Sequence, residues 1–302
     1  MADWIAYWNG RFVQDGEIAI SPADRGFTLG DAVYEVTRTY RHQPFHLDRH
    51  LDRLYASLAY VELDPGLDRG EMADLTYAVL DRNRIHLGPD DDVLLTHRVT
   101  RGPAGPLFEG LPPGPPTVLI TCRPVQFARF ARLYDDGVEL ATPRVRMPIS
   151  GGIDPRVKSQ SRLLMALGGV QVAREGGPVI PLFADVHGYV TETALSNIFF
   201  VLWDHLVTPP DAVVLGGITR QVVIELAETL EVPVVRRRIH LQEISEASEA
   251  FVTSTSVGLL PVSSVNGRPL ALVPGATTRR LTEAFSRYVG VDIVAQSRAH
   301  VA

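Results

Sequence analysis

The order of strand-like and helix-like segments limits the fold of this chain more than any other feature of its sequence. Residues 33–40 (VYEVTRTY) alternate apolar and polar side chains, which predicts a half-buried strand. Residues 47–60 carry leucines three and four positions apart, which predicts a helix with one buried face. Further along, strands and helices mix without the strict alternation of a doubly wound sheet. The sequence therefore predicts an α+β fold.

The predicted segments fall into two groups, which we interpret as two domains. Residues 1–120 are expected to form a small α+β domain that starts with a hairpin turning at Asn9-Gly10. Residues 121–135 are expected to connect it to a larger domain over residues 136–302. Helices are expected over 70–86, 158–175, 219–230 and 276–288, and strands over 93–100, 117–122, 137–142, 178–184, 196–202, 232–236 and 250–254. A turn rich in Gly and Pro is expected at 102–116.

Composition narrows the class of protein. The 302 residues are 45% apolar, which is enough to fill two medium-sized cores. A net charge of −6 makes nucleic acid a poor candidate partner. Cys122 is the only cysteine, so an intrachain disulfide or a thiolate metal cluster cannot form. We find no signal peptide and no apolar run of membrane-spanning length, so we expect a cytoplasmic protein without a membrane partner.

Three features could carry chemistry, and each also has a plain structural explanation. Lys158 begins a predicted helix, where the helix dipole disfavours a cation and can lower the pKa of an amine, as Schiff-base chemistry requires. Gly216-Gly217 precedes another predicted helix with Thr219 at its expected N-cap, an arrangement that can bind an anion. Hydroxyl side chains fill residues 253–256 at a strand end. The plain explanations are an exposed lysine, a capped helix and a capped turn.

A metal site is not expected. His46, Asp48 and His50 lie two residues apart across a change from strand to helix, so they do not share one helical face.

Taken together, the segments resemble the class IV aminotransferases, the pyridoxal-phosphate enzymes of fold type IV. The resemblance runs in order over nearly the whole chain. It includes Asp24-Arg25-Gly26, Gly30-Asp31, Val33-Tyr34-Glu35-Val36, His50-Leu51-Asp52-Arg53-Leu54, Val99-Thr100-Arg101-Gly102, Lys158-Ser159, Val190-Thr191-Glu192, Ser196-Asn197-Ile198-Phe199, Gly217-Ile218-Thr219-Arg220 and Phe251-Val252-Thr253-Ser254-Thr255.

The resemblance implies two α+β domains with pyridoxal 5′-phosphate between them, the larger domain being the cofactor-binding one, and a homodimer. It implies that Lys158 is the catalytic lysine, which holds the cofactor as a Schiff base and shuttles a proton. Glu192 is implied to face the pyridine nitrogen and keep it protonated. The remaining cofactor-binding positions implied by the resemblance are Arg53, Gly217, Ile218, Thr219, Ser254 and Thr255.

The substrate is less constrained than the reaction. The D-amino-acid enzymes carry Arg-x-His on the loop after VTRG, and this chain reads PAGPLF from Pro103 instead. Arg38 and Arg98 are therefore candidate anchors for the substrate carboxylate, because an arginine fork matches a carboxylate. Tyr34 and Ser256 complete the predicted substrate-binding set.

Four interpretations follow from the resemblance. Because the stretch around Tyr34 is more like the D-amino-acid and (R)-amine enzymes, we expect transfer of an amino group from a D-amino acid or (R)-amine to a 2-oxo acid. The alternative is a branched-chain L-amino-acid aminotransferase, which Arg38 favours but Leu163 disfavours, since it stands where those enzymes place a tyrosine. A lyase acting on aminodeoxychorismate comes next. A cofactor-binding relative without activity is disfavoured, because both Lys158 and Glu192 are retained.

Overall fold

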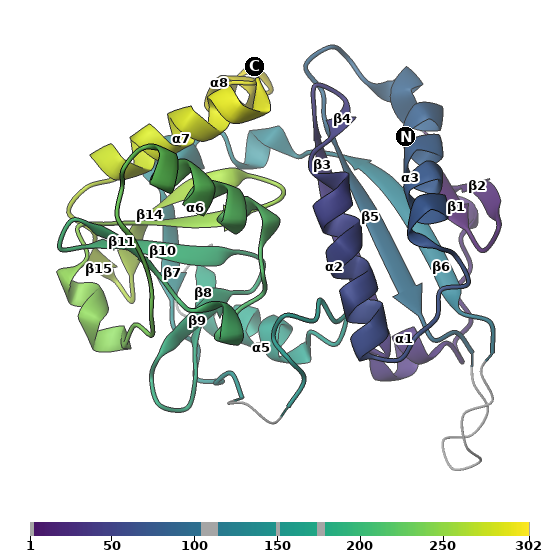
Figure 1. The fold of residues 1–302 in the computed structure, drawn as a ribbon, viewed down its shortest axis with the longest axis horizontal. Helices are drawn as coiled ribbons and strands as arrows, with labels where there is room; N and C mark the ends of the chain where they lie inside the picture. Colours follow the sequence, from purple (N-terminus) through teal and green to yellow (C-terminus); the bar gives the residue numbers. More distant parts are fainter. Residues whose placement is uncertain (1–2, 104–113, 149–151, 174–178, 302) are drawn as a thin grey trace. The chain divides into compact units, whose positions relative to one another are not determined.

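The computed structural model describes residues 3–103, 114–148, 152–173 and 179–301. The chain divides into two compact units (Figure 1). The first unit comprises Met1–Val125 and Val157–Arg162, and the second comprises Gln126–Arg156 and Leu163–Ala302. The change of unit at Val125 lies within the range expected for the connection. The return of 157–162 to the first unit corrects the expectation that everything after residue 136 belongs to the larger domain.

The first unit is built on a six-stranded sheet with the order β2-β1-β6-β5-β3-β4, in which every neighbouring pair is antiparallel. Its elements are β1 (Ile5–Trp8), β2 (Arg11–Gln14), α1 (Arg25–Leu29), β3 (Ala32–Tyr40), β4 (Gln43–Pro44), α2 (Leu47–Tyr60), α3 (Arg69–Asn83), β5 (Val93–Thr100) and β6 (Thr117–Pro124). The predicted hairpin is confirmed: Asn9 and Gly10 both have positive φ values, 45° and 86°, as a two-residue hairpin turn requires.

Helices α2 and α3 cover one face of this sheet (Figure 1). The leucines of α2 are buried against apolar side chains of the central strands, including Val93, Leu95 and Val99. Alternate residues of β5 are buried, so the strand sends one row of side chains into this core and the other row to the opposite face. That opposite face carries Tyr34, Arg38 and Arg98.

The helix predicted over 158–175 is wrong for its first five residues, 158–162. Helix α5 begins only at Leu163 and ends at Ala173. Before it, the chain runs along the edge of β3: the N–H of Tyr34 donates to the carbonyl of Lys158 at 3.0 Å, and the N–H of Gln160 donates to the carbonyl of Ala32 at 2.8 Å. These long-range backbone bonds hold the segment in an extended form that local helix propensity does not predict.

The second unit is built on a nine-stranded mixed sheet with the order β12-β11-β10-β13-β14-β7-β8-β9, and β15 pairs with β14. Its other main elements are the helices α4 to α8. The bounds are α4 (Leu133–Asp136), β7 (Val138–Ala141), β8 (Ile180–Ala184), β9 (Val190–Thr193), β10 (Asn197–Leu202), β11 (His205–Thr208), α6 (Ile218–Thr229), β12 (Val234–Arg236), β13 (Glu249–Ser254), β14 (Gly258–Val265), β15 (Arg268–Pro269), α7 (Ala276–Val289) and α8 (Ile293–Ala299).

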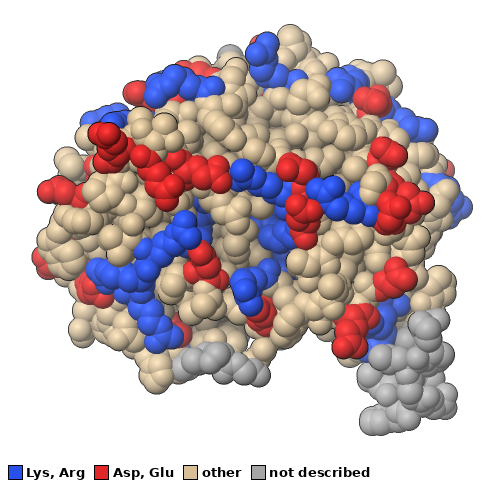
Figure 2. All heavy atoms as spheres, in the orientation of Figure 1, with Lys and Arg blue, Asp and Glu red and all other residues tan. Residues whose placement is uncertain are grey.

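Aromatic side chains fill the core of the second unit. Phe199 on β10 and Phe251 on β13 are fully buried and stack with ring centroids 5.0 Å apart. Helices α6 and α7 each bury an apolar face, and Val222 and Phe285 are both 0% exposed. No described helix is both long and apolar enough to cross a membrane. On the face drawn in Figure 2, acidic and basic side chains lie interspersed.

Candidate active site

Lys158 is the predicted catalytic residue, and the extended segment next to β3 places it. Its backbone N–H donates to the hydroxyl of Ser57 on α2 at 3.1 Å. Its side chain is half-buried, and Nζ lies 4.5 Å from the ring centroid of Tyr34, a cation–π distance. The helix-dipole explanation for a reactive lysine is therefore wrong, because no helix begins at Lys158. The amine is instead fixed against a tyrosine ring on the sheet.

The two candidate carboxylate anchors share the sheet face of Tyr34 but lie at different distances from it. Arg98 on β5 is the direct cross-strand partner of Tyr34, and paired side chains have Cβ atoms about 5 Å apart. Arg38 lies four residues further along β3, or about 13 Å at 3.3 Å per residue. Arg38 is also 1% exposed, with its guanidinium 4.3 Å from the ring centroid of Tyr40. Of the two candidates, Arg98 is therefore the one next to Tyr34, whose ring lies against the amine of Lys158.

A cavity of about 180 Å³ adjoins Arg98 within the first unit. Its walls are largely apolar, and Ile20, Phe27, Ala32 and Leu119 contribute to them. Gln160 also lines the cavity, and its buried Oε1 has no hydrogen-bond partner among the described residues. Burial lowers the pKa of Arg98, and within the described ranges no carboxylate pairs with it. A half-buried cation beside an unsatisfied acceptor is suited to a small polar ligand.

Arg53, a predicted phosphate ligand, belongs to a buried charged cluster on the other face of β3. Its Nε and Nη2 donate to the two carboxylate oxygens of Glu35 at 2.8 and 2.6 Å. His50 Nδ1 donates to the same carboxylate at 2.9 Å. Burial would raise the pKa of Glu35, but the charge of Arg53 and the hydrogen bonds from His50 and Arg53 hold that pKa well below its usual value. Glu35 is thus an anion that fixes the guanidinium of Arg53.

Glu192, the predicted partner of the pyridine nitrogen, lies on β9 in the second unit. Its Oε2 accepts hydrogen bonds from the side-chain amide of Asn197 and from the backbone N–H of Leu215, both at 3.1 Å. The Asn197 amide also donates to the carbonyl of Leu215 at 3.0 Å. The carboxylate is half-buried and held from two directions, so its position does not depend on a bound ligand.

The predicted phosphate-binding residues of the second unit lie around Asn197. A Cβ atom at Gly217 would lie 2.0 Å from Oδ1 of Asn197, so only glycine fits there. Gly217 is the N-cap of α6, and no side chain caps this helix. The prediction of Thr219 as N-cap is therefore wrong: Ile218 and Thr219 are the first residues of the helix, and both are 4% exposed. Their N–H groups lie where helix N-termini bind anions.

The hydroxyl side chains of residues 253–256 lie at the end of β13, opposite Asn197. Thr253 is the cross-strand partner of Asn197, and its buried Oγ1 has no hydrogen-bond partner in the described part of the chain. Ser254, Thr255 and Ser256 are half-buried, and the hydroxyls of Ser254 and Ser256 lie 3.2 Å apart. An uncapped helix start, the unsatisfied hydroxyl of Thr253 and half-buried hydroxyls at the end of the same strand together fit a phosphate.

Sequence reasoning assigned no role to two residues that organise the site. Glu35 fixes Arg53, and Asn197 joins Glu192, the start of α6 and the end of β13. Both residues belong to motifs shared with the class IV aminotransferases, and membership of these motifs is the one sequence signal that points to them. Their roles depend on contacts between strands and loops that no sequence spacing reveals.

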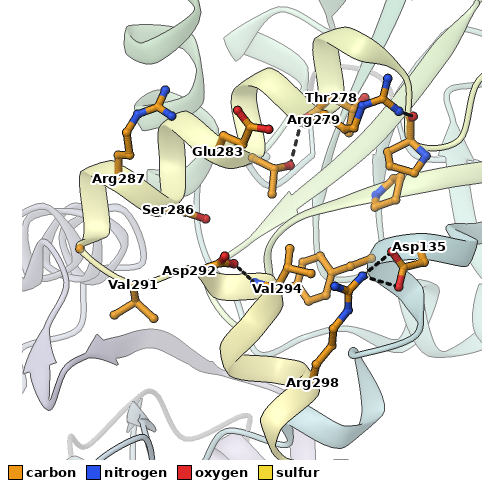
Figure 3. A pocket seen from close by; sticks show the side chains of 15 residues that line it. Asp135, Thr278, Arg279, Glu283, Ser286, Arg287, Val291, Asp292, Val294 and Arg298 are labelled. Carbon is orange, nitrogen blue, oxygen red and sulfur yellow. Dashed lines mark hydrogen bonds and ion pairs between the residues drawn. The ribbon is translucent and has the colours of Figure 1, made fainter.

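A wider cavity of about 640 Å³ lies in the second unit along α7 and α8 (Figure 3). Arg298 pairs with Asp135 at 2.6 Å on one side, and Arg287 and Glu283 project from α7 on the other. None of the predicted site residues is among the described residues that line it. Its size therefore does not make it the candidate active site.

Comparison with known proteins identifies the family. The family model for amino-transferase class IV matches residues 32–265, so the chain belongs to the class IV aminotransferases. This confirms the predicted family and the two-domain α+β fold of type IV. Class IV aminotransferases use pyridoxal 5′-phosphate, as predicted.

Individual relatives bear on the substrate. A protein of Methanocaldococcus jannaschii, provisionally named as a branched-chain-amino-acid aminotransferase, is 34% identical over 284 residues, covering 92% of this chain and 94% of the relative. The D-alanine aminotransferase of Listeria monocytogenes is 30% identical over 271 residues, covering 87% and 88%. The crystal structure of the Escherichia coli branched-chain amino acid aminotransferase has a TM-score of 0.86 at 25% identity, covering 94% of each chain. These relatives favour the branched-chain alternative over the expected D-amino-acid or (R)-amine donor.

Proposed function

We propose that this protein transfers the amino group of branched-chain L-amino acids to a 2-oxo acid. The observation that carries the proposal is the combination of Arg98 and its cavity: a half-buried cation, the cross-strand partner of the tyrosine that lies against Lys158, opens onto walls of hydrocarbon side chains. Such a site fits a carboxylate joined to an apolar side chain. The L configuration is supported by the relatives named as branched-chain enzymes.

The described residues fit pyridoxal 5′-phosphate, which when bound supplies an aldehyde that exchanges amino groups and a ring that takes up electron density. Lys158 would hold it covalently, and its Nζ would move the proton from Cα of the substrate. Glu192 would hold a proton on the ring nitrogen by its negative charge. The N–H groups of Ile218 and Thr219 and the hydroxyls of residues 254–255, all in the second unit, would bind the phosphate.

The chain's own residues would orient the substrate in two ways. Arg98 would bind the carboxylate with its fork of N–H donors. Tyr34 would keep the lysine amine next to that fork, because its ring already lies against Nζ. Arg38 is too far along β3 to reach the same carboxylate, so we assign it a structural role beside Tyr40.

Transamination of a D-amino acid or (R)-amine is the second candidate function. The Listeria D-alanine aminotransferase, at 30% identity, supports it. The Arg-x-His of the D-amino-acid enzymes is missing from the sequence after Gly102, and the loop residues 104–113 themselves lie outside the described part of the structure.

A donor panel tests the proposal. L-Leucine, D-alanine, D-glutamate and both enantiomers of 1-phenylethylamine are each offered with pyruvate and with 2-oxoglutarate. We expect L-leucine to give a kcat/KM at least about tenfold above every other donor, a difference of ~1.4 kcal/mol. A higher value for D-alanine or D-glutamate would refute the branched-chain assignment.

Two matched arginine variants test the anchor. Arg98→Met keeps the side-chain stem and removes the charge, and it should raise the KM for L-leucine roughly thirtyfold, as expected for a lost charge-assisted hydrogen-bond pair. Arg38→Met is the control and should change this KM less than about threefold. The reverse result would move the anchor to Arg38.

A further inference from the structure

Asp24 is a buried carboxylate that the proposed mechanism does not use. It is 1% exposed and is the N-cap of the short helix α1. Its Oδ1 accepts the N–H of Gly26 at 2.7 Å, and its Oδ2 accepts two hydroxyls, from Thr100 at 2.9 Å and Thr117 at 2.7 Å. A surface N-cap needs only the first of these contacts, so the two hydroxyl bonds call for a separate explanation.

The two threonines are the last cross-strand pair of the β5–β6 hairpin, at the point where the chain leaves the sheet. We call Asp24 and its hydrogen bonds to Thr100 and Thr117 the clamp. A backbone bond adds to it, because the N–H of Arg25 donates to the carbonyl of Gly102 at 3.0 Å. One carboxylate therefore ties both strands of the hairpin to each other and to α1. Strand ends are among the parts of a fold that open most easily, and these contacts stabilise this one.

The clamp lies next to Arg98. Arg98 and Leu119 form the neighbouring cross-strand pair on the same sheet face, two residues or about 7 Å from Thr100 and Thr117. Asp24, Thr100, Thr117 and Arg98 all line the 180 Å³ cavity. The oxygens of Asp24 are occupied by N–H and hydroxyl groups, so its described contacts hold the wall of the cavity.

We propose that Asp24 is a positioning residue for substrate recognition: it closes the end of the β5–β6 hairpin through Thr100 and Thr117 and so fixes Arg98 where the carboxylate binds. The inference rests on the proposed role of Arg98. A guanidinium binds a carboxylate by two parallel N–H bonds only when both planes are held in line, so a loosened strand end weakens recognition without removing the charge.

Single hydroxyl substitutions test the clamp in the holoenzyme. Thr117→Val removes one hydrogen bond to Asp24 at nearly constant shape, and Thr117→Ser restores it. Thr37→Val is the matched control, because Thr37 is a buried threonine of the same sheet whose hydroxyl has no partner among the described residues. Two inhibitors with the carbon chain of leucine are compared: 4-methylvalerate, which has only the carboxylate, and isopentylamine, which has only the amine.

We expect Thr117→Val to raise the inhibition constant of 4-methylvalerate about tenfold, to leave that of isopentylamine within about twofold, and to leave cofactor affinity unchanged. Thr117→Ser should recover the parent value, and Thr37→Val should not depart from it. In the Arg98→Met background, Thr117→Val should have no further effect on 4-methylvalerate.

Other outcomes separate this inference from the proposed function. Equal weakening of both inhibitors, or none, would overturn the role of Asp24, because the clamp would then not act through the carboxylate anchor. An undiminished effect of Thr117→Val in the Arg98→Met background would overturn it as well. If the donor panel rejects L-leucine while 4-methylvalerate still depends on Thr117 and Arg98, the proposed function fails and the clamp stands.

Discussion

Replacing His97 should make the stability of the protein less sensitive to acid. His97 lies on β5 opposite Glu35, is fully buried, and shares a hydrogen bond of 2.7 Å between Nε2 and the hydroxyl of Thr76. Burial lowers the pKa of His97 to about 4, although the charge of Glu35 opposes this. In the unfolded chain a histidine titrates near 6.5. Between these two pKa values, His97 is protonated in the unfolded chain and neutral in the folded chain.

The sign and size of the effect follow from this difference. Because the unfolded state binds more protons between pH 6.5 and about 4, the free energy of unfolding falls as the pH falls through that window. For a shift from 6.5 to about 4, the loss attributable to His97 between pH 7 and pH 5 is about 2 kcal/mol. A neutral glutamine at position 97 can keep a polar contact with Thr76 and has no such titration.

Urea unfolding of the apoprotein at pH 7 and pH 5 measures the effect. The parent should lose about 2 kcal/mol more than His97→Gln between these pH values, even though the variant starts from a lower stability. His187→Gln, at an exposed histidine in a turn, controls for the loss of a histidine as such. Parallel losses in the parent and in His97→Gln, within about 0.5 kcal/mol, would refute a buried neutral histidine at this position.

Two further predictions concern the residues that we assign to the cofactor. Borohydride reduction followed by peptide mapping should place the pyridoxyl group on Lys158, and a label on another lysine would contradict the assignment. Lys158→Ala should lose at least about a thousandfold in turnover, because one amine both attaches the cofactor and moves the proton. Glu192→Gln should lower kcat about a hundredfold while cofactor stays bound, because the charge that holds a proton on the ring nitrogen is gone; activity within twofold of the parent would remove Glu192 from the site.

Local sequence patterns predicted most helices and strands, because burial of one face imposes a period that the chain displays. The helix over residues 47–60 and the strand over 93–100 have the predicted bounds. The helix prediction failed at 158–162, where the backbone bonds of β3 to Lys158 and Gln160 decide the conformation. Such pairing joins positions more than a hundred residues apart and leaves no periodic pattern in the sequence.

The same distinction applies to the site. The functional residue types could be chosen from motifs, but the residues that orient them could not. The sequence predicts only that Glu35 is a polar residue of an alternating strand. The fold shows that its carboxylate accepts hydrogen bonds from His50 and Arg53. Arg38 and Arg98 are equivalent candidates in the sequence, and the antiparallel register of β3 with β5 separates them by placing Arg98 opposite Tyr34.

This register also bears on which residues bind the substrate and which bind the cofactor. The extended segment ties Lys158 to β3, so its amine and the guanidinium of Arg98 are held by one sheet of one unit. An amino acid presents its amine and its carboxylate on adjacent atoms, and these two groups must be met by partners at a fixed separation. The segment of Lys158 and the strand β5 of Arg98 both pair with β3, so one rigid sheet provides that separation. Glu192 and the start of α6, to which we assign the cofactor, belong to the other unit. Substitutions at Arg98 should therefore alter which donor is accepted, and substitutions at Glu192 should alter the rate for all donors alike.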